Sequence, residues 1–285
     1  MSIQIITDSA SDLTQAEAKQ LNITVLPLTV TFGETSYRDG IDIDHKTFFE
    51  KLIETDELPV TSQLPPYSYE QAFRAAAEQG DTVICLCVSS KLSGCYQSAN
   101  IAASSVDGDI RIVDTLNVTI GERILVDLAV RCRDQGMSAD EIVRILEAEK
   151  ANVRLIALLD TLEYLKKGGR ISATAAFAGT LLNVKPVIAI EDGLVKQLGK
   201  ARGSRNGSNM LNNMVKKDRI DFSKPLHLAY SGLSDAMLVK YVADSKDLYH
   251  CQPEELPCCT IGSVIGTHVG PGAIACAYFT APEQA

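Results

Sequence analysis

The segment DTVICLCVSSKLSG, residues 81–94, is apolar on both faces up to Val88 and then becomes abruptly polar. A strand with two apolar faces is typical of the centre of a parallel sheet that is covered by helices on both sides. Helical patterns flank this segment at Tyr67 to Gln79 and at Cys95 to Ser104. We therefore predict an α/β fold around a parallel sheet.

The rest of the first half continues this alternation of strands and helices. The patterns predict strands at Ile3 to Ile6, Ile23 to Val30 and Ile110 to Val113, and helices from Thr14, at Ile120 to Arg133 and at Ser138 to Lys150. Two of these helices begin with a capping box, because Thr14 and Ser138 are each followed three residues later by a glutamate. The rhythm is that of a parallel sheet with crossover helices.

The second half has a different pattern, because Glu191-Asp192-Gly193 separates two apolar runs and predicts a β-hairpin. Further elements are expected as a helix at Ser204 to Lys217, a strand at Leu226 to Tyr230, a helix at Ser234 to Ala243, and strands near Cys258 and Ala273. This order predicts an α+β region with antiparallel pairing. We place the change of domain near Asn152.

Composition excludes several classes of protein. Of 285 residues, 46% are hydrophobic and 22% are charged, so the chain has enough apolar material for a core and is not a disordered chain or a coiled coil. The net charge of −9 repels a phosphate backbone and disfavours nucleic acid as a partner. The N-terminal residues lack a secretion signal, and no apolar run is long enough to span a bilayer, so we expect a cytoplasmic location and no transmembrane segment. Eight cysteines without a Cys-x-x-Cys pair predict buried, reduced thiols.

Two hydroxyl-rich segments are candidate ligand sites. Ser89 to Gly94 leaves the end of a buried parallel strand and enters a helix, which is where α/β sheets bind anions. The alternative, in which Ser90 or Ser93 only caps the helix, is equally consistent with the spacing. Thr61-Ser62-Gln63 lies in an expected loop between Pro59 and Pro65, where an ordinary polar loop is the alternative.

A glycine-rich segment and two basic clusters complete the candidates. Residues 262–272 contain four glycines around His268, one of only four histidines in the chain. This density of glycine permits a ligand or another segment to approach the backbone closely. Lys166 to Arg170 and Lys200 to Arg205 are basic segments suited to meeting a phosphate or an acidic partner, with solvated surface charge as the alternative. Neither cluster has the spacing of a phosphate-binding loop, so we expect no nucleotide site.

These segments together resemble the DegV family, whose better-studied members are the fatty-acid-binding subunits of bacterial fatty acid kinase. The resemblance covers almost the whole chain and rests on the order and spacing of short motifs. They are Thr7-Asp8-Ser9-Ala10-Ser11-Asp12-Leu13, Pro27-Leu28, Tyr37-Arg38-Asp39-Gly40, Thr61-Ser62-Gln63, Ser89-Ser90-Lys91-Leu92-Ser93-Gly94, Gly168-Gly169-Arg170-Ile171-Ser172, Asn183-Val184-Lys185-Pro186, Lys200-Ala201-Arg202-Gly203 and Gly266-Thr267-His268-Val269-Gly270-Pro271-Gly272.

The resemblance implies two domains with a long-chain fatty acid bound between them. It implies a three-layer α/β/α domain with a parallel sheet over residues 1–152 and a two-layer α+β domain with a mixed sheet over residues 153–285. Thr61 and Ser93 are then expected to contact the carboxylate of the fatty acid, with His268 supporting them. Ser62 and Gly94 complete the expected binding set, which is Thr61, Ser62, Ser93, Gly94 and His268.

The resemblance also implies that the chemistry is done by a partner. In the family an ATP-dependent kinase phosphorylates the carboxylate of the bound fatty acid, so this chain is expected to be a lipid carrier and not an enzyme. Arg170 and Arg202 are expected to contact that kinase or the transferred phosphoryl group. ATP and magnesium belong to the kinase, so no cofactor or metal site is expected here.

Three positions depart from the family pattern: Leu64 replaces a proline, Cys95 a threonine and Ala275 a glycine. None of them removes an expected head-group ligand. Because Cys95 is expected at a helix N-terminus, we expect its thiol to have a lowered pKa and unusual reactivity.

Two other functions stay open at this point. A lipid-ester hydrolase could use Ser93 as nucleophile and His268 as base, with Asp8 or Asp114 orienting the histidine. The Gly-x-Ser-x-Gly elbow of such enzymes is missing around Ser93. A third function is that of an interaction protein in which a bound lipid only fills space.

Overall fold

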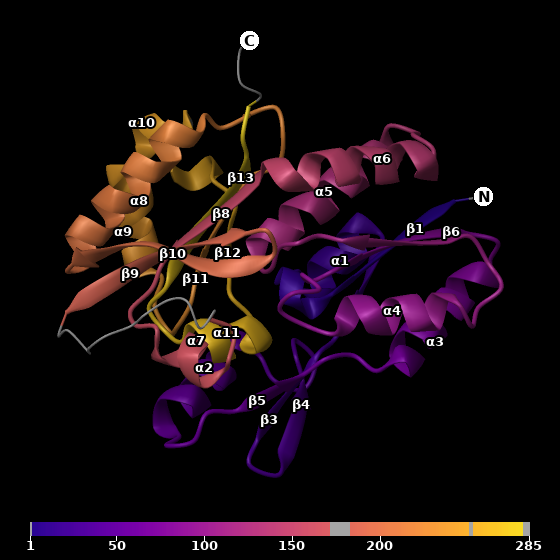
Figure 1. Ribbon diagram of the computed structural model, residues 1–285, viewed down its shortest axis with the longest axis horizontal. Helices are drawn as coiled ribbons and strands as arrows, with labels where there is room; N and C mark the ends of the chain where they lie inside the picture. Colours follow the sequence, from indigo (N-terminus) through magenta and orange to yellow (C-terminus); the bar gives the residue numbers. More distant parts are fainter. Residues whose placement is uncertain (1, 172–182, 251–252, 282–285) are drawn as a thin grey trace.

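The computed structural model describes residues 2–171, 183–250 and 253–281, and it contains two main sheets that face a common helix (Figure 1). Ser172, the last residue of the Gly168-Gly169-Arg170-Ile171-Ser172 motif, and Cys251 lie outside the described residues. The mixed α/β class and the separate parallel and mixed sheets agree with the fold class expected above. The expected division of the chain after Asn152 stays a prediction. Among the described residues, no helix is both long and apolar enough to cross a membrane.

The first sheet is entirely parallel and has the order β2-β1-β6-β7. Its strands are β1 (Ile3–Asp8), β2 (Ile23–Leu26), β6 (Thr82–Cys87) and β7 (Ile110–Asp114). Every residue of β6 is buried, as the doubly apolar pattern predicted. The strand order reverses between β1 and β6, and such a switch point leaves a crevice at the carboxyl ends of the two strands.

Helices cover both faces of the parallel sheet. They are α1 (Gln15–Leu21), α3 (Pro66–Ala77), α4 (Cys95–Ala103), α5 (Ile120–Asp134) and α6 (Ala139–Glu149), and a 3-10 turn, η1 (Ser9–Ser11), follows β1. The capping boxes predicted at Thr14 and Ser138 are both present, with Glu17 and Glu141 as their reciprocal partners. These four residues fix the starts of α1 and α6 as the sequence indicated.

The second sheet is mixed and has the order β10-β9-β8-β13-β11-β12. Its strands are β8 (Val153–Leu158), β9 (Val184–Glu191), β10 (Leu194–Arg202), β11 (His227–Tyr230), β12 (Cys258–Thr260) and β13 (Ile274–Phe279). The helices of this part are α7 (Glu163–Lys167), α8 (Ser204–Asp218), α9 (Ala236–Asp244), α10 (Lys246–Tyr249) and α11 (Ser263–Val269), with 3-10 turns η2 (Lys150–Asn152) and η3 (Pro253–Glu255). The hairpin predicted around Gly193 is the β9–β10 pair.

Side chains alternate between the two faces of this second sheet. On β8, Ile156 and Leu158 pack into a core with α8 and α9 on one face of the sheet. Leu155 and Ala157 lie on the opposite face, toward the parallel sheet. Helix α5 covers part of that other face and also packs against β1 and β6 of the parallel sheet. The space between the two sheets is therefore lined by apolar side chains from both.

Two regions correct the sequence-based expectations. Ile23 to Val30 is not one strand: β2 ends at Leu26, and β3 (Thr29–Phe32) belongs to a separate antiparallel sheet with β4 (Thr35–Arg38) and β5 (Val60–Ser62). Pro27 lacks the N–H that a continuing ladder needs, and the Leu28 N–H instead donates to the hydroxyl of Ser9 at 3.1 Å. The second correction is that Thr61 and Ser62 lie in strand β5 and not in a loop.

Four helices were not predicted, namely α2, α7, α10 and α11. Helix α2 (His45–Glu54) begins at Asp44, whose side chain accepts a hydrogen bond from the Thr47 N–H. Helix α11 occupies the glycine-rich segment that contains His268, and no side chain at its own N-cap, Gly262, holds its first turn. The side chains of Asp12 and Asp39 hold the first turn instead.

Candidate functional site

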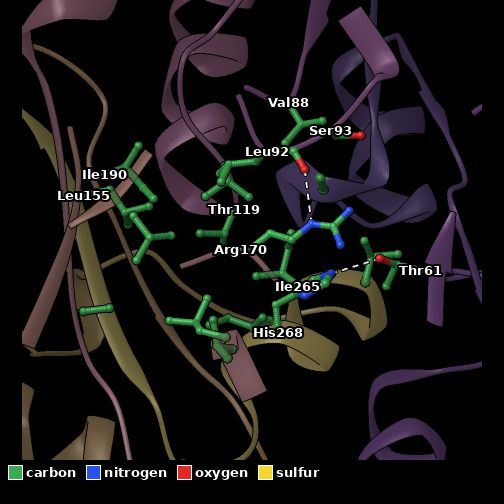
Figure 2. A pocket seen from close by; sticks show the side chains of 18 of the residues that line it. Thr61, Val88, Leu92, Ser93, Thr119, Leu155, Arg170, Ile190, Ile265 and His268 are labelled. Atoms are coloured by element: carbon green, nitrogen blue, oxygen red, sulfur yellow. Dashed lines mark hydrogen bonds between the residues drawn. The ribbon is translucent and has the colours of Figure 1, made fainter. Parts of the chain in front are cut away.

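A largely apolar cavity of about 230 Å³ lies between the two sheets and ends at a cluster of polar side chains (Figure 2). Most of its wall is aliphatic, with Val88 and Leu92 from the parallel side and Leu155 and Ile190 from the mixed sheet. The polar lining residues are Thr61, Ser62, Gln63, Ser93, Thr119, Arg170 and His268. In Figure 2, Thr61, Ser93, Arg170 and His268 lie on one side of the view and Leu155 and Ile190 on the other. Such segregation suits an amphiphile with one polar end.

The cavity lies at the switch point of the parallel sheet. Ala10, in the turn after β1, and Val88, directly after β6, both line it. The segment from Leu92 to Gly94 then follows β6 and leads into α4. The sequence therefore placed the Ser93 segment at the correct edge of the sheet.

Thr61 and His268 form the centre of the polar end. Oγ1 of Thr61 lies 2.9 Å from Nε2 of His268, and the two side chains come from β5 and α11. Burial, and secondly the charge of Arg170, lower the pKa of His268 to about 4, so the imidazole is neutral near pH 7. The other ring nitrogen, Nδ1, is buried and has no hydrogen-bond partner among the described residues.

Ser93 lies in the loop before α4 and points its hydroxyl at Cys95. The distance from Ser93 Oγ to Cys95 Sγ is 3.3 Å, and the backbone N–H of Cys95 approaches the same oxygen at 3.4 Å. The N-cap of α4 is Gly94, so Ser93 is not an ordinary helix cap. A Cβ at Gly94 would lie 1.8 Å from Oε1 of Gln63, so the amide of Gln63 packs directly against the backbone of Gly94 and would have to move if residue 94 carried a side chain.

Arg170 is tethered at the polar end by two backbone carbonyls. Its Nε donates to the Leu92 carbonyl at 3.3 Å, and its Nη1 donates to the Gly168 carbonyl at 2.8 Å. The guanidinium group thus connects the end of α7 to the loop that carries Ser93. Arg202 has a different position: it is exposed at the end of β10 and does not line the cavity.

Buried carboxylates hold the helix that carries His268. Asp12 accepts a hydrogen bond from the Gly262 N–H at 2.8 Å and another from the hydroxyl of Thr119. Asp39 accepts from the Ser263 N–H at 3.0 Å and from the Ser263 hydroxyl. Burial raises the pKa of Asp12 to about 7 and also raises the pKa of Asp39. The start of α11 is thereby fixed by residues more than 200 positions away.

Sequence reasoning missed Thr119 as a lining residue, and it left Gln63 out of the expected binding set although Gln63 belongs to a candidate segment. Thr119 has the backbone angle φ 51°, which is rare for a β-branched residue, and its N–H donates to the Ala10 carbonyl at 2.7 Å. No local pattern predicts this conformation, because it is imposed by contacts with η1 and Asp12. Gln63 was part of a quoted motif, and its amide donates to Ser98 Oγ at 3.2 Å.

The expectation of a lowered pKa at Cys95 is wrong. The side chain is fully buried, and burial, with a smaller effect of the nearby Asp8, raises the pKa of its thiol to about 12. Loss of hydration at this position exceeds any lowering by the helix N-terminus. The general expectation of buried thiols holds at Cys85, Cys87, Cys95, Cys132 and Cys276, whereas Cys258 is exposed and Cys259 is half-buried.

The geometry does not assemble a hydrolase relay. His268 bonds to Thr61 and not to Ser93, and its second nitrogen meets no carboxylate. The acids that could have oriented it are engaged elsewhere: Asp8 accepts from the Val88 and Ala10 N–H groups, and Asp114 accepts from the Ser90 N–H. Within the described ranges, no group of three or more His, Cys, Asp or Glu residues is placed to hold a metal ion.

Comparison with known proteins gives a consistent result. A family described as "Uncharacterised protein, DegV family" matches residues 2–281. A DegV domain-containing protein of Caldanaerobacter subterraneus is 34% identical over 273 residues, which are 95% of this chain and 96% of that protein. A fatty-acid-binding DegV family protein from Thermus thermophilus is 32% identical, with a TM-score of 0.87 over 99% of this chain and 100% of the other. A stearic-acid-binding protein from Eubacterium ventriosum is 30% identical, with a TM-score of 0.88 over 98% of each chain.

Proposed function

The chain belongs to the DegV family, and from this premise we propose that its cavity binds a long-chain fatty acid whose carboxylate lies at Thr61 and Ser93. The observation that carries the proposal is an aliphatic cavity that ends at hydroxyl groups and a neutral histidine. The structures from Thermus thermophilus and Eubacterium ventriosum, both described as fatty-acid-binding, support it.

The acyl chain supplies most of the binding free energy in this proposal. Burying roughly 14 methylenes at about 0.8 kcal/mol each contributes on the order of 11 kcal/mol before the costs of association. The aliphatic wall from Leu155, Ile190 and Val88 provides the surface for that burial. The head group then determines the direction in which the chain enters.

The polar end of the cavity can bind a carboxylate through hydrogen bonds, and no lysine lines it among the described residues. The hydroxyls of Thr61 and Ser93 donate hydrogen bonds to the anion, which are stronger than bonds between neutral groups. We propose that Ser62 and Gly94, which also line this end, complete the head-group site. One carboxylate oxygen is left available for later chemistry.

We further propose that a separate ATP-dependent kinase phosphorylates this carboxylate and that the present chain is the carrier. The position of Arg170 supports this proposal, because its guanidinium lies at the polar end and is oriented by two carbonyls. Arginine pairs well with phosphate oxygens. Arg202 is proposed as a second contact with the kinase, on the exposed end of β10.

Extraction of the purified protein with organic solvent, followed by mass spectrometry, tests the carrier function. We expect a long-chain fatty acid in about equimolar amount. The delipidated protein should then bind stearic acid in a titration. A protein that yields no lipid and does not bind stearic acid contradicts the proposal.

The role of Arg170 is tested separately with a fatty acid kinase subunit and ATP. We expect Arg170→Ala to bind stearic acid but to support much less acyl-phosphate formation. Lys167→Ala is the matched control, because Lys167 is a nearby cation that is exposed and does not line the cavity. Equal acyl-phosphate formation with both variants would favour a protein in which the lipid only fills space.

A further inference from the structure

The imidazole of His45 lies between two backbone carbonyls. His45 is the first residue of helix α2, and its side chain is half-buried. Its Nδ1 lies 3.0 Å from the carbonyl oxygen of Ile261, and its Nε2 lies 2.8 Å from the carbonyl oxygen of Gly232. A carbonyl oxygen only accepts hydrogen bonds, so each nitrogen must donate. Only the doubly protonated, cationic ring has a hydrogen on both nitrogens.

The neutral ring satisfies only one of the two carbonyls. In either tautomer the bare nitrogen faces a carbonyl oxygen at hydrogen-bond distance, with lone pairs on both atoms. Hydrogen bonds from a charged donor are also stronger than those from a neutral one. The arrangement around His45 therefore favours the imidazolium, and loss of a proton removes one of its two hydrogen bonds.

The two carbonyls belong to segments that hold helix α11 at its two ends. Ile261 precedes α11, and its N–H donates to the Tyr230 carbonyl at 2.8 Å. The hydroxyl of Ser231, the neighbour of Gly232, donates to the carbonyl of Gly270, directly after α11, at 2.6 Å. His45 therefore ties α2 to the residue before α11 and to the loop that binds the residue after it.

Helix α2 also packs directly on α11 (Figure 1). The ring of Phe49, one turn after His45, lies 4.9 Å from the imidazole. A Cβ at Gly266 would lie 2.6 Å from the ring of Phe48 and 2.9 Å from that of Phe49, so both rings lie against the backbone of α11. The bonds of His45 and this aromatic contact act on the same pair of helices.

We propose that His45 is a proton-controlled clamp, which as the imidazolium donates to both carbonyls and holds α2 against α11, and which releases one carbonyl when it loses a proton. Histidine is the side chain whose charge ordinarily changes between pH 5 and pH 8. Ile261 lines the cavity, so the clamp also acts on part of the cavity wall. The clamp itself goes beyond the proposed function, and only its effect on lipid exchange rests on that function.

Charged groups on α2 act on the ring in both directions. The positive end of the helix dipole opposes a cation at the first helical position, and the charge of Lys46 adds to this effect. Asp44, directly before His45, favours the cation. Bonds from Thr47 and, to a smaller extent, the charge of His45 lower the pKa of Asp44. A helix dipole contributes less at such an end than a hydrogen bond to a charged group does.

The other elements around the ring present three carboxyl groups and a phenol. Asp12 and Asp39 accept from the N–H groups of the two residues after Ile261, and burial raises the pKa of Asp12 to about 7. On β11, the ring of Tyr230 lies edge-on at 5.7 Å. Burial and, secondly, Asp235 raise the pKa of this phenol, so it stays neutral. Asp12 can therefore take up a proton in the same range as a histidine, and the test must separate the two.

Nitrogen NMR of protein labelled with ¹⁵N-histidine reads the charge of the ring. The His45 signals are assigned by their loss in His45→Gln. At pH 6 we expect pyrrole-like shifts for both nitrogens and two N–H protons that are protected from exchange with water. At pH 9 we expect one pyridine-like nitrogen and one protected N–H. A single protonated nitrogen at pH 6, or the absence of protected N–H protons, overturns the proposal.

Urea unfolding at pH 6 and pH 9 measures what the clamp contributes. His45→Gln is the reference, because its amide donates to one carbonyl at either pH. The contribution requires a bound proton, so it is present at low pH and is lost as the pH rises. We expect the unfolding constant of wild type relative to His45→Gln to be at least about fivefold lower at pH 6 than at pH 9. An equal ratio at both values overturns the proposal.

The same comparison in an Asp12→Asn background removes the second titrating group. We expect the dependence of the ratio on pH to persist there. Its disappearance would assign the effect to Asp12 and overturn the proposal.

Transfer of radiolabelled stearic acid from the loaded protein to serum albumin tests the effect on lipid exchange. We expect the transfer rate to rise between pH 6 and pH 9 about threefold more in wild type than in His45→Gln. Equal increases would show that the clamp does not control exchange. A wild-type protein that binds no stearic acid would reject the proposed function, whereas the NMR and urea results would still decide on the clamp.

Discussion

Thr61 and His268 are 207 positions apart in the chain, and their side chains meet in a hydrogen bond of 2.9 Å. The contact joins the edge strand β5 to helix α11, and it lies at the polar end of a cavity whose remaining wall is mostly aliphatic. The head-group site is thus produced by the tertiary fold. Each of its parts can be tested by a small change in one side chain.

Thr61→Val removes the hydroxyl while nearly preserving the shape of the side chain. We expect this variant to bind stearic acid about 1–3 kcal/mol more weakly, because the carboxylate and His268 both lose a partner. Isothermal titration of the delipidated protein measures the change. Thr61→Ser keeps the hydroxyl and is the matched control. If Thr61→Val and Thr61→Ser bind equally tightly, Thr61 does not contact the head group.

Ala275→Leu fills part of the cavity from strand β13. Ala275 lines the cavity, whereas Ala277, two residues along the same face of the strand, is buried in the core outside it. Both substitutions by leucine are expected to cost about 1–3 kcal/mol of stability through overpacking. Only Ala275→Leu should weaken stearic acid relative to lauric acid, since each displaced methylene loses about 0.8 kcal/mol.

Calorimetric titration with the two acids compares these variants, and urea unfolding shows that both are folded. A shift in chain-length preference in Ala277→Leu, or none in Ala275→Leu, would contradict the assignment of the cavity as the acyl-chain site.

Cys95 should react slowly with thiol reagents. Its full burial and its raised pKa leave little exposed thiolate, whereas Cys258 is accessible to solvent. We expect iodoacetamide, followed by peptide mass mapping, to modify Cys258 in the native protein and Cys95 only after unfolding in urea. Labelling of Cys95 as fast as Cys258 in the native state would show that the segment around Ser93 opens to solvent.

Asp12 should make stability depend on pH in a predictable direction. Its pKa is about 7 in the folded protein against an ordinary value of 3.8, so its contribution is fully present below pH 3.8 and is lost as the pH rises through 7. We expect the difference in unfolding free energy between wild type and Asp12→Asn to decrease from pH 4.5 to pH 8. Urea unfolding at a series of pH values measures this difference.

Asp42→Asn is the control for that experiment. The ion pair with Arg38 lowers the pKa of Asp42 to about 2, so its contribution is present above pH 3.8 and is lost only in strong acid. The difference in unfolding free energy between wild type and Asp42→Asn should therefore stay constant between pH 5 and pH 8. A flat profile for Asp12→Asn as well would mean that Asp12 does not take up a proton in this range.

Patterns within a short stretch of sequence predicted much of the fold. The doubly apolar strand β6, the capping boxes at Thr14 and Ser138, and the hairpin turn at Gly193 all depend on neighbours a few residues away. Such features are determined locally and are visible without an alignment. The edge of the sheet that carries Ser93 follows from the same strand.

Features set by distant contacts were not predictable in this way. Helix α11 is short and contains Gly266, yet it forms because Asp12 and Asp39 satisfy its first N–H groups. The thiol of Cys95 was expected to be acidic from its helix position, but surrounding segments exclude water from it. Burial by remote parts of the chain leaves no mark in the local sequence.

Helix α5 packs against both main sheets: it contacts β1 and β6 of the parallel sheet and β8, β11 and β13 of the mixed sheet. Its buried positions therefore run around most of its circumference. A chain cut after Asn152 would keep this helix but lose the second sheet, and the buried side chains of α5 that pack against that sheet would be exposed to water. Such fragments should aggregate during biosynthesis, because they expose a large apolar surface. The two halves are therefore expected to fold as one cooperative unit and to be inherited together.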